Sequence, residues 1–162
     1  GDCIASTIMY NKKLSKEKFK LYHSGEKIGD TLMMSKDIMI SGKKLPVIDI
    51  KKNFNEALKI INQKKLGIVV VLKKKYVAGL ISDGDLRRGM KFLSKKTSLE
   101  NLMTKNPMVA NENMSAEKAL SVMNEKKITS LLIVSDNDFK RKKKMKLRGI
   151  IHIHFLLKSG IK

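Results

Sequence analysis

A short stretch of the sequence, residues 80–88, carries side chains that suit the binding of a sugar or a phosphate. It ends an apolar run, begins a predicted helix, and contains Ser82, Asp83, Asp85, Arg87 and Arg88. A helix N-terminus presents backbone N–H groups to an anion, and a carboxylate beside it accepts hydrogen bonds from sugar hydroxyls. The structural alternative is that Asp85 serves only as the helix N-cap, which is common where a strand turns into a helix.

Two segments with a helical pattern position this stretch within a repeat. Residues 53–65 and 115–127 align at a constant offset of 62 positions. In each segment apolar residues recur at i, i+3, i+4 and i+7, which predicts a helix with one face toward a core. Asn53 and Ser115 precede the segments as N-caps, and a pair of lysines at each end suits the helix dipole.

Short apolar runs complete each repeat. Residues 68–72 and 131–134 are continuously apolar and rich in branched side chains, which predicts strands buried on both faces. A second strand is predicted over 76–82 and over 147–152, and Pro46 and Pro107 mark short strands at equivalent starts upstream. The sequence therefore predicts an α/β fold of two packed β-α-β-β-α repeats.

The composition limits the class of protein. The chain has 162 residues, 42% of them hydrophobic, and no apolar run approaches the roughly 20 residues that span a bilayer. No secretory leader is recognisable. Cys3 is the single cysteine, so neither an intrachain disulfide nor a cysteine-based zinc site is possible. We expect a soluble, cytoplasmic protein without a membrane partner, metal or other cofactor.

The formal charge of +20 is unusual for a globular protein. Only four of the basic residues are arginines and aromatic residues make up 5%, whereas nucleic-acid readers rely on arginine and aromatic stacking. We therefore interpret most lysines as solvated surface and do not expect a nucleic-acid partner. Residues 140–148 hold seven basic side chains where the second repeat is eight residues longer than the first, which predicts a mobile solvated hairpin. Binding to nucleic acid or a phosphate-rich ligand is the alternative.

The motif at residues 79–86, set in this repeat, resembles that of cystathionine-beta-synthase (CBS) domains, which occur in pairs as sensors of adenosyl ligands. A closer resemblance covers nearly the whole chain. It is to the C-terminal part of D-arabinose 5-phosphate isomerases, in which a sugar isomerase (SIS) domain precedes a CBS pair. The motifs that carry it, in order, are residues 1–2, 23–29, 37–39, 82–88, 128–130 and 152–154.

The resemblance implies a domain organisation and a reaction. Residues 1–34 would be the helical end of a SIS domain, 35–96 the first CBS domain and 97–162 the second. The family converts ribulose 5-phosphate to arabinose 5-phosphate for synthesis of the lipopolysaccharide sugar Kdo. His23 would take part in sugar ring opening or proton transfer. Since the rest of that active site would belong to a SIS domain not included here, we expect this chain alone to be inactive.

The resemblance also implies a nucleotide site. Asp85 would bind the ribose hydroxyls with Ser82 and Asp83 nearby, while Arg87 and Arg88 would neutralise phosphate. Thr129 and Ser130 would line the site between the copies, or else bond neighbouring strand backbone. The second copy has His152 and Phe155 in place of Ser82 and Asp85, so we expect one competent site in each chain.

These expectations define the functions to be tested. The chain would be a regulatory and oligomerising module that binds a nucleotide or nucleotide sugar, dimeric through its CBS pair and tetrameric in the parent enzyme. The alternatives are a basic nucleic-acid-binding module or an element that serves dimerisation alone. His152 and His154 would face the same side of a strand, but a metal site lacks a third ligand in the sequence.

Overall fold

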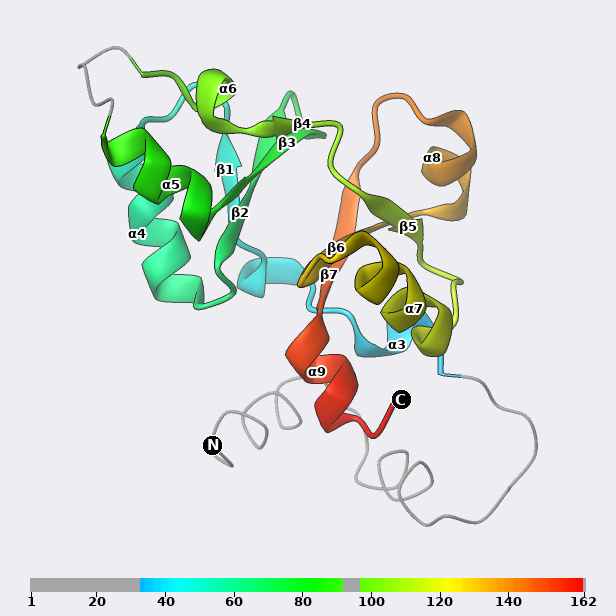
Figure 1. Cartoon of the computed structure of the whole chain (residues 1–162). Helices are drawn as coiled ribbons and strands as arrows, with labels where there is room; N and C mark the ends of the chain where they lie inside the picture. The colour runs from blue at the N-terminus through cyan, green and yellow to red at the C-terminus, as the bar shows by residue number, and fades with distance from the viewer. Residues whose placement is uncertain (1–32, 92–96, 162) are drawn as a thin grey trace. The chain divides into compact units, whose positions relative to one another are not determined.

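A computed structural model of the chain describes residues 33–91 and 97–161 (Figure 1). The chain divides into two units, residues 1–32 and 33–162, and the description below concerns the second. The predicted N-terminal helices, Cys3 and His23 lie outside the described residues.

The first repeat has the predicted β-α-β-β-α order. It consists of β1 (Val47–Asp49), α4 (Phe54–Lys64), β2 (Ile68–Lys73), β3 (Tyr76–Ser82) and α5 (Asp83–Met90). Strand β1 pairs parallel with β2, and β2 pairs antiparallel with β3. A short fourth strand, β4 (Thr104–Lys105), pairs antiparallel with β3 and completes the sheet.

The second repeat reproduces this arrangement. It consists of β5 (Val109–Asn111), α7 (Ala116–Lys126), β6 (Ser130–Val134), β7 (Leu147–His152) and α9 (Ile153–Lys158). In the first sheet Val71 pairs with Gly79, and in the second sheet Ile133 pairs with Gly149 at the equivalent place. The internal repeat predicted from the sequence is therefore confirmed by strand register.

Both faces of the central strands are buried, as the continuous apolar runs predicted. In β2, Val69 and Val71 pack into a core with the helices of the first repeat. Their neighbours Ile68 and Val70 point the other way, into a cluster that also contains Leu132 and Ile150 of the second repeat. A shared apolar core therefore joins the two repeats.

The segment that precedes each repeat packs on the other repeat. Helix α3 (Ser35–Ile38) lies ahead of the first repeat, yet the backbone N–H of Ser35 donates to Met114 O at 2.7 Å and Ile40 pairs with Ile150. A 3-10 helix, Gly42–Lys44, then leads to β1. Helix α6 (Leu99–Leu102) precedes the second repeat, but Leu99 is buried in the core of the first.

The predicted caps are present on both amphipathic helices. Asn53 Oδ1 accepts from the N–H of Glu56 at 3.0 Å, and Ser115 Oγ accepts from the N–H of Lys118 at 3.2 Å. The second lysine of each terminal pair, Lys65 or Lys127, closes its helix with a left-handed backbone, φ 56° and 53°.

Three sequence predictions need correction. The insertion is not a simple hairpin, because it contains helix α8 (Asp136–Arg141) between β6 and β7. This helix is capped by Ser135 and anchored to β5 by a hydrogen bond from Asn111 to Asp136.

The prediction that His152 and His154 lie on one side of the same strand is also wrong, since β7 ends at His152 and His154 lies in α9. Pro107 lies two residues before β5 whereas Pro46 directly precedes β1, so the prolines are one position out of register.

Candidate functional site

The predicted strand-to-helix junction is present at the end of β3. Ser82 is the last residue of β3 and the N-cap of α5, and the backbone N–H of Asp83 donates to Gly67 O at 2.9 Å. This bond ties the first turn of α5 to the start of β2. The end of β3 and the start of β2 thus fix the position of the helix N-terminus.

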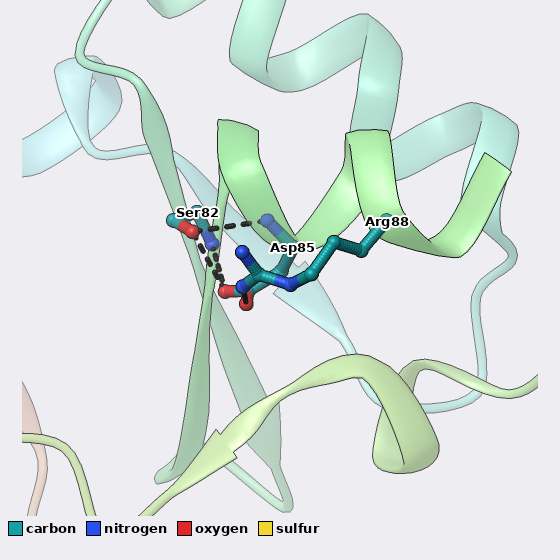
Figure 2. A network of polar contacts seen from close by, with 3 residues as sticks. All are labelled: Ser82, Asp85 and Arg88. Carbon is teal, nitrogen blue, oxygen red and sulfur yellow. Dashed lines mark hydrogen bonds and ion pairs between the residues drawn. The ribbon is translucent and has the colours of Figure 1, made fainter. Parts of the chain in front are cut away.

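Asp85 is held firmly at this junction (Figure 2). Its Oδ2 accepts from the backbone N–H and from the hydroxyl of Ser82, each at 2.8 Å, while its own N–H donates to Ser82 Oγ at 3.1 Å. The alternative prediction, that Asp85 is the helix N-cap, is therefore wrong. Ser82 is the N-cap, and Asp85 is the third residue of the helix, in a reciprocal capping box with Ser82.

Both arginines of α5 are engaged by carboxylates of the same helix. Arg88 donates to Asp85 Oδ1, and Arg87 donates to Asp83 Oδ2 at 2.6 Å. The Asp85 side chain is 16% exposed, whereas the Arg88 side chain is 72% exposed. Because exposed ion pairs contribute only about 0–1 kcal/mol, either arginine can leave its partner for a ligand phosphate at low cost.

The hydrogen-bond capacity of Asp85 limits what it can bind. A carboxylate has about four acceptor positions, and three are occupied by Ser82 N–H, Ser82 O–H and Arg88. One position is left for a ligand hydroxyl. A vicinal diol, which donates twice, requires Arg88 to release Oδ1. The same movement would free the Arg88 guanidinium for a phosphate, so Arg88 would link the two contacts.

The equivalent junction of the second repeat has different chemistry. His152 occupies the N-cap of α9, where its Nδ1 accepts from the N–H of His154 at 3.3 Å. Phe155, at the position of Asp85, packs against the apolar cluster shared by the two repeats. An aromatic ring offers no acceptor for sugar hydroxyls, so the structure agrees with the loss of the sugar-binding signature in this copy.

Thr129 and Ser130 lie beside His152 rather than beside Asp85 in the strand register. Ser130 pairs with His152 across β6 and β7, and Thr129 O accepts from the N–H of Ile153 at 2.9 Å. Within residues 33–91 and 97–161, no hydrogen bond links either residue to the Ser82–Asp85 pair. The Ser130 hydroxyl is buried and has no hydrogen-bond partner among the described residues, so it does not bond strand backbone as the alternative proposed.

The two histidines of the second repeat influence each other. Their rings are stacked with centroids 5.0 Å apart. Burial lowers the pKa of His152 below its usual value, and the nearby His154 lowers it further. Within the part of the chain that the structure describes, no group of three or more His, Cys, Asp or Glu side chains is placed to hold a metal ion, and no helix could cross a membrane.

One feature of the site was missed in the sequence, namely that the arginines bind carboxylates of their own helix. The spacing contained the signal. Asp83 precedes Arg87 by four positions and Asp85 precedes Arg88 by three, and both spacings place side chains on one helix face.

The sequence comparisons agree with the fold. The CBS domain family matches residues 33–91 and 99–154. The chain is 37% identical over 162 residues to an uncharacterized protein of Rickettsia prowazekii, covering 99% of this chain and 48% of that protein. It is 30% identical over 165 residues to arabinose 5-phosphate isomerase KdsD of Yersinia pestis, with the same coverage. The chain thus spans about half the length of the curated relatives it matches.

Solved structures give the same architecture. The crystal structure of CBSX2 in complex with AMP superposes with a TM-score of 0.65 at 24% identity, over 79% of this chain and 96% of that one. The CBS domain pair of MJ0100, in complex with 5'-methylthioadenosine and S-adenosyl-L-methionine, gives 0.66 at 18% identity, over 78% and 94%. At these identities the likeness establishes the fold.

Proposed function

Because the chain belongs to the CBS-domain family, we propose that residues 33–161 form the regulatory and oligomerising module of an arabinose 5-phosphate isomerase. The 30% identity to KdsD over almost the whole chain supports the link to this enzyme. The proposed domains are residues 1–34, 35–96 and 97–162. In this proposal the first segment is the end of a SIS domain and the other two are the CBS domains.

The proposed ligand is a nucleotide or nucleotide sugar bound at the N-terminus of α5. The observation that carries this proposal is Asp85, a mostly buried carboxylate whose Oδ1 is bonded to an exposed arginine. A ribose diol would replace Arg88 at Oδ1, and Arg88 would then pair with the phosphate. Ser82 and Asp83 would contribute hydrogen bonds and Arg87 a second cation. The adenosyl complexes of the structural neighbours support this ligand class.

The isomerase reaction would belong to the intact parent protein in the cytoplasm. It would convert ribulose 5-phosphate to arabinose 5-phosphate through an enediol, with His23 helping to open the sugar ring or move a proton. The product would feed synthesis of Kdo for lipopolysaccharide. The CBS pair would dimerise and contribute to a tetramer of the parent, and its ligand would modulate the isomerase.

Thermal unfolding with and without ligand tests the site. The panel contains AMP, ATP, S-adenosylmethionine, CMP and the cytidylyl-activated Kdo sugar. A ligand present at a hundred times its dissociation constant adds about 2.7 kcal/mol of stability. We expect one member of the panel to raise the melting temperature of the wild type and to leave that of Asp85→Asn unchanged.

A matched control separates lost binding from a weakened helix cap. Glu56 is the third residue of α4, in a capping box with Asn53, and it pairs with Lys52 at 3.1 Å. Glu56→Gln therefore removes the same kind of carboxylate from the capping box of another helix, α4, and it should keep the ligand response. An equal response in Asp85→Asn would place the ligand elsewhere. No response to any nucleotide, with stability that depends on protein concentration, would favour an element that serves dimerisation alone.

A further inference from the structure

Two lysine-rich turns from different repeats lie close together at one end of the central strands. The first is the turn between β2 and β3, and the second lies between α8 and β7. We call their seven exposed lysines the lysine surface: Lys73, Lys74, Lys75, Lys142, Lys143, Lys144 and Lys146.

A backbone contact fixes the two turns side by side. The N–H of Val77, just after the first turn, donates to the carbonyl oxygen of Met145, inside the second, at 2.9 Å. Leu72 and Leu147, which flank the turns, pack with Val77 in the same apolar cluster. The charges of both repeats are therefore gathered on one rigidly supported surface, which neither turn could form alone.

The lysine surface is not neutralised by the residues around it. Within the described residues, two of the flanking basic side chains have acidic partners: Lys140 pairs with Asp136 at 2.7 Å and Arg148 with Glu112 at 3.5 Å. Asp138, the remaining carboxylate of α8, accepts from the backbone N–H of Lys146 at 2.8 Å. None of the seven lysine ammonium groups has a carboxylate within 4.0 Å in residues 33–91 and 97–161.

The lysine surface is separate from the proposed nucleotide site. Strand β3 starts next to the first turn at Tyr76 and ends at Ser82. At about 3.3 Å per residue the two ends are about 20 Å apart, which is beyond the reach of a mononucleotide bound at Asp85. The lysine surface therefore calls for an anionic partner of its own.

The side chains in the two turns indicate the class of that partner. The large exposed hydrophobic residues of the described chain are Val47, Met90, Met108 and Leu157, and all of them lie outside the turns. A membrane-binding surface normally adds apolar side chains to its charges, and a protein interface normally has aromatic or arginine anchors. A lysine-rich surface without large exposed hydrophobic residues suits evenly spaced phosphates, which the ammonium groups contact as point charges.

We propose that the lysine surface binds the phosphate backbone of nucleic acid without sequence preference. This interaction would be independent of the nucleotide site at α5. The sequence favoured solvated lysines because arginine and aromatic residues are few, but contacts to a phosphate backbone require neither. The fold changes that interpretation by adding Lys73, Lys74 and Lys75 to the run.

The backbone allows charge to be removed without harming the fold. Lys74 and Lys75 form the two-residue turn between β2 and β3 with φ of 50° and 73°, a conformation in which Asn-Gly is preferred. K74N/K75G therefore removes two charges and reduces the backbone strain in the turn. Lys142 and Lys144, with φ of 55° and 50°, allow K142G/K144G in the same way.

The same geometry provides a matched control. Lys65 and Lys127 also have a left-handed backbone, but they close α4 and α7 ahead of β2 and β6, away from the two turns. K65G/K127G thus removes the same charge and relieves similar strain outside the lysine surface. Residues 1–32 are common to all variants and cannot produce a difference between them.

Fluorescence anisotropy of a short random-sequence DNA duplex, titrated with the full chain over a series of salt concentrations, tests the proposal. The slope of log K against log salt is about −0.9 for each phosphate contacted. We expect each surface variant to reduce the magnitude of this slope by about 2 and to weaken binding in low salt. The control should keep the wild-type slope, and a second duplex sequence should bind equally.

Three outcomes would overturn the proposal. Equal losses in the control and the surface variants would mean that net charge alone drives binding. No binding of the wild type in low salt would exclude a nucleic-acid surface. Binding to phosphatidylserine vesicles but not to the duplex would assign the lysines to a membrane instead.

Discussion

The side chain of Met103 lies directly against the backbone of Gly79. A Cβ atom placed on Gly79 would come within 2.5 Å of Met103 Sδ and within 2.9 Å of Thr104 O. The second repeat has the same relationship, because a Cβ on Gly149 would overlap the side chain of Met39. Each methionine belongs to a segment that precedes one repeat and packs on the other. The two glycines therefore make room for the crossing segments that join the repeats.

Gly79→Ala should destabilise the protein. The added methyl group meets both a side chain and a backbone oxygen, and overpacking of this kind typically costs about 1–3 kcal/mol. Urea unfolding measures the loss. Gly79→Ala combined with Met103→Ala should recover part of it, because the shorter side chain removes the closest contact. A wild-type midpoint for the single variant would show that the segment carrying Met103 can move away freely.

Lys127→Gly should stabilise the protein. Lys127 closes α7 with φ of 53°, a conformation that costs a residue with a side chain about 1–2 kcal/mol and suits glycine. The gain should be about 1 kcal/mol, seen as a higher urea midpoint at an unchanged slope. Lys127→Ala, which loses the same charge but keeps a Cβ, should show no such gain. Equal gains in both variants would assign the effect to charge instead of backbone conformation.

Acid should destabilise the fold partly through His152. Burial lowers its pKa in the folded state, so the folded protein binds fewer protons than the unfolded chain. Stability from this group is complete above the unfolded pKa of about 6.5 and is lost as the pH falls through the lower folded pKa. His152→Asn keeps an N-cap acceptor and removes the titration, so its melting temperature should fall less between neutral and mildly acidic pH. An unchanged pH profile would contradict a lowered pKa of the half-buried His152.

Arg88→Ala should separate nucleoside from nucleotide binding. Loss of the arginine frees Asp85 Oδ1, so adenosine should bind at least as well as to the wild type. AMP should bind about tenfold more weakly, because a charged hydrogen bond to phosphate is lost. Calorimetric titration of both ligands measures the difference. Arg141→Ala, which removes an exposed arginine from the end of α8, should leave both affinities unchanged. Equal loss of both ligands in Arg88→Ala would show that Arg88 does not distinguish phosphate.

The repeat made much of this fold predictable. The offset between the helical segments at 53–65 and 115–127 fixed two copies of one unit, and the strands β3 and β7 have the predicted bounds. The N-cap residues Asn53 and Ser115 stand just where the helical pattern of apolar residues begins. Because these two independent signals agree, the start of each helix could be predicted. The junction at Ser82 and Asp85 was predictable for the same reason.

Contacts between distant segments were not predictable in the same way. Nothing in the local pattern of residues 33–40 or 97–105 indicates that each segment packs on the other repeat. Helix α8 had a signal, since Ser135 precedes Asp138 by three positions as in a capped helix, but it is short and the lysines around it dominated the interpretation. The lysine surface depends on the contact between Val77 and Met145, which join different repeats.

The most direct test of the nucleotide site is an amide NMR titration of the full chain with the ligand selected by thermal unfolding. We predict that the amide signals of Ser82, Gly84, Asp85 and Arg88 shift together and saturate at one ligand per chain. The amides of His152 and Phe155 should respond little, because the second junction lacks the carboxylate. Saturating shifts centred on His152 and Phe155, with the α5 amides unmoved, would contradict a site built on Asp85.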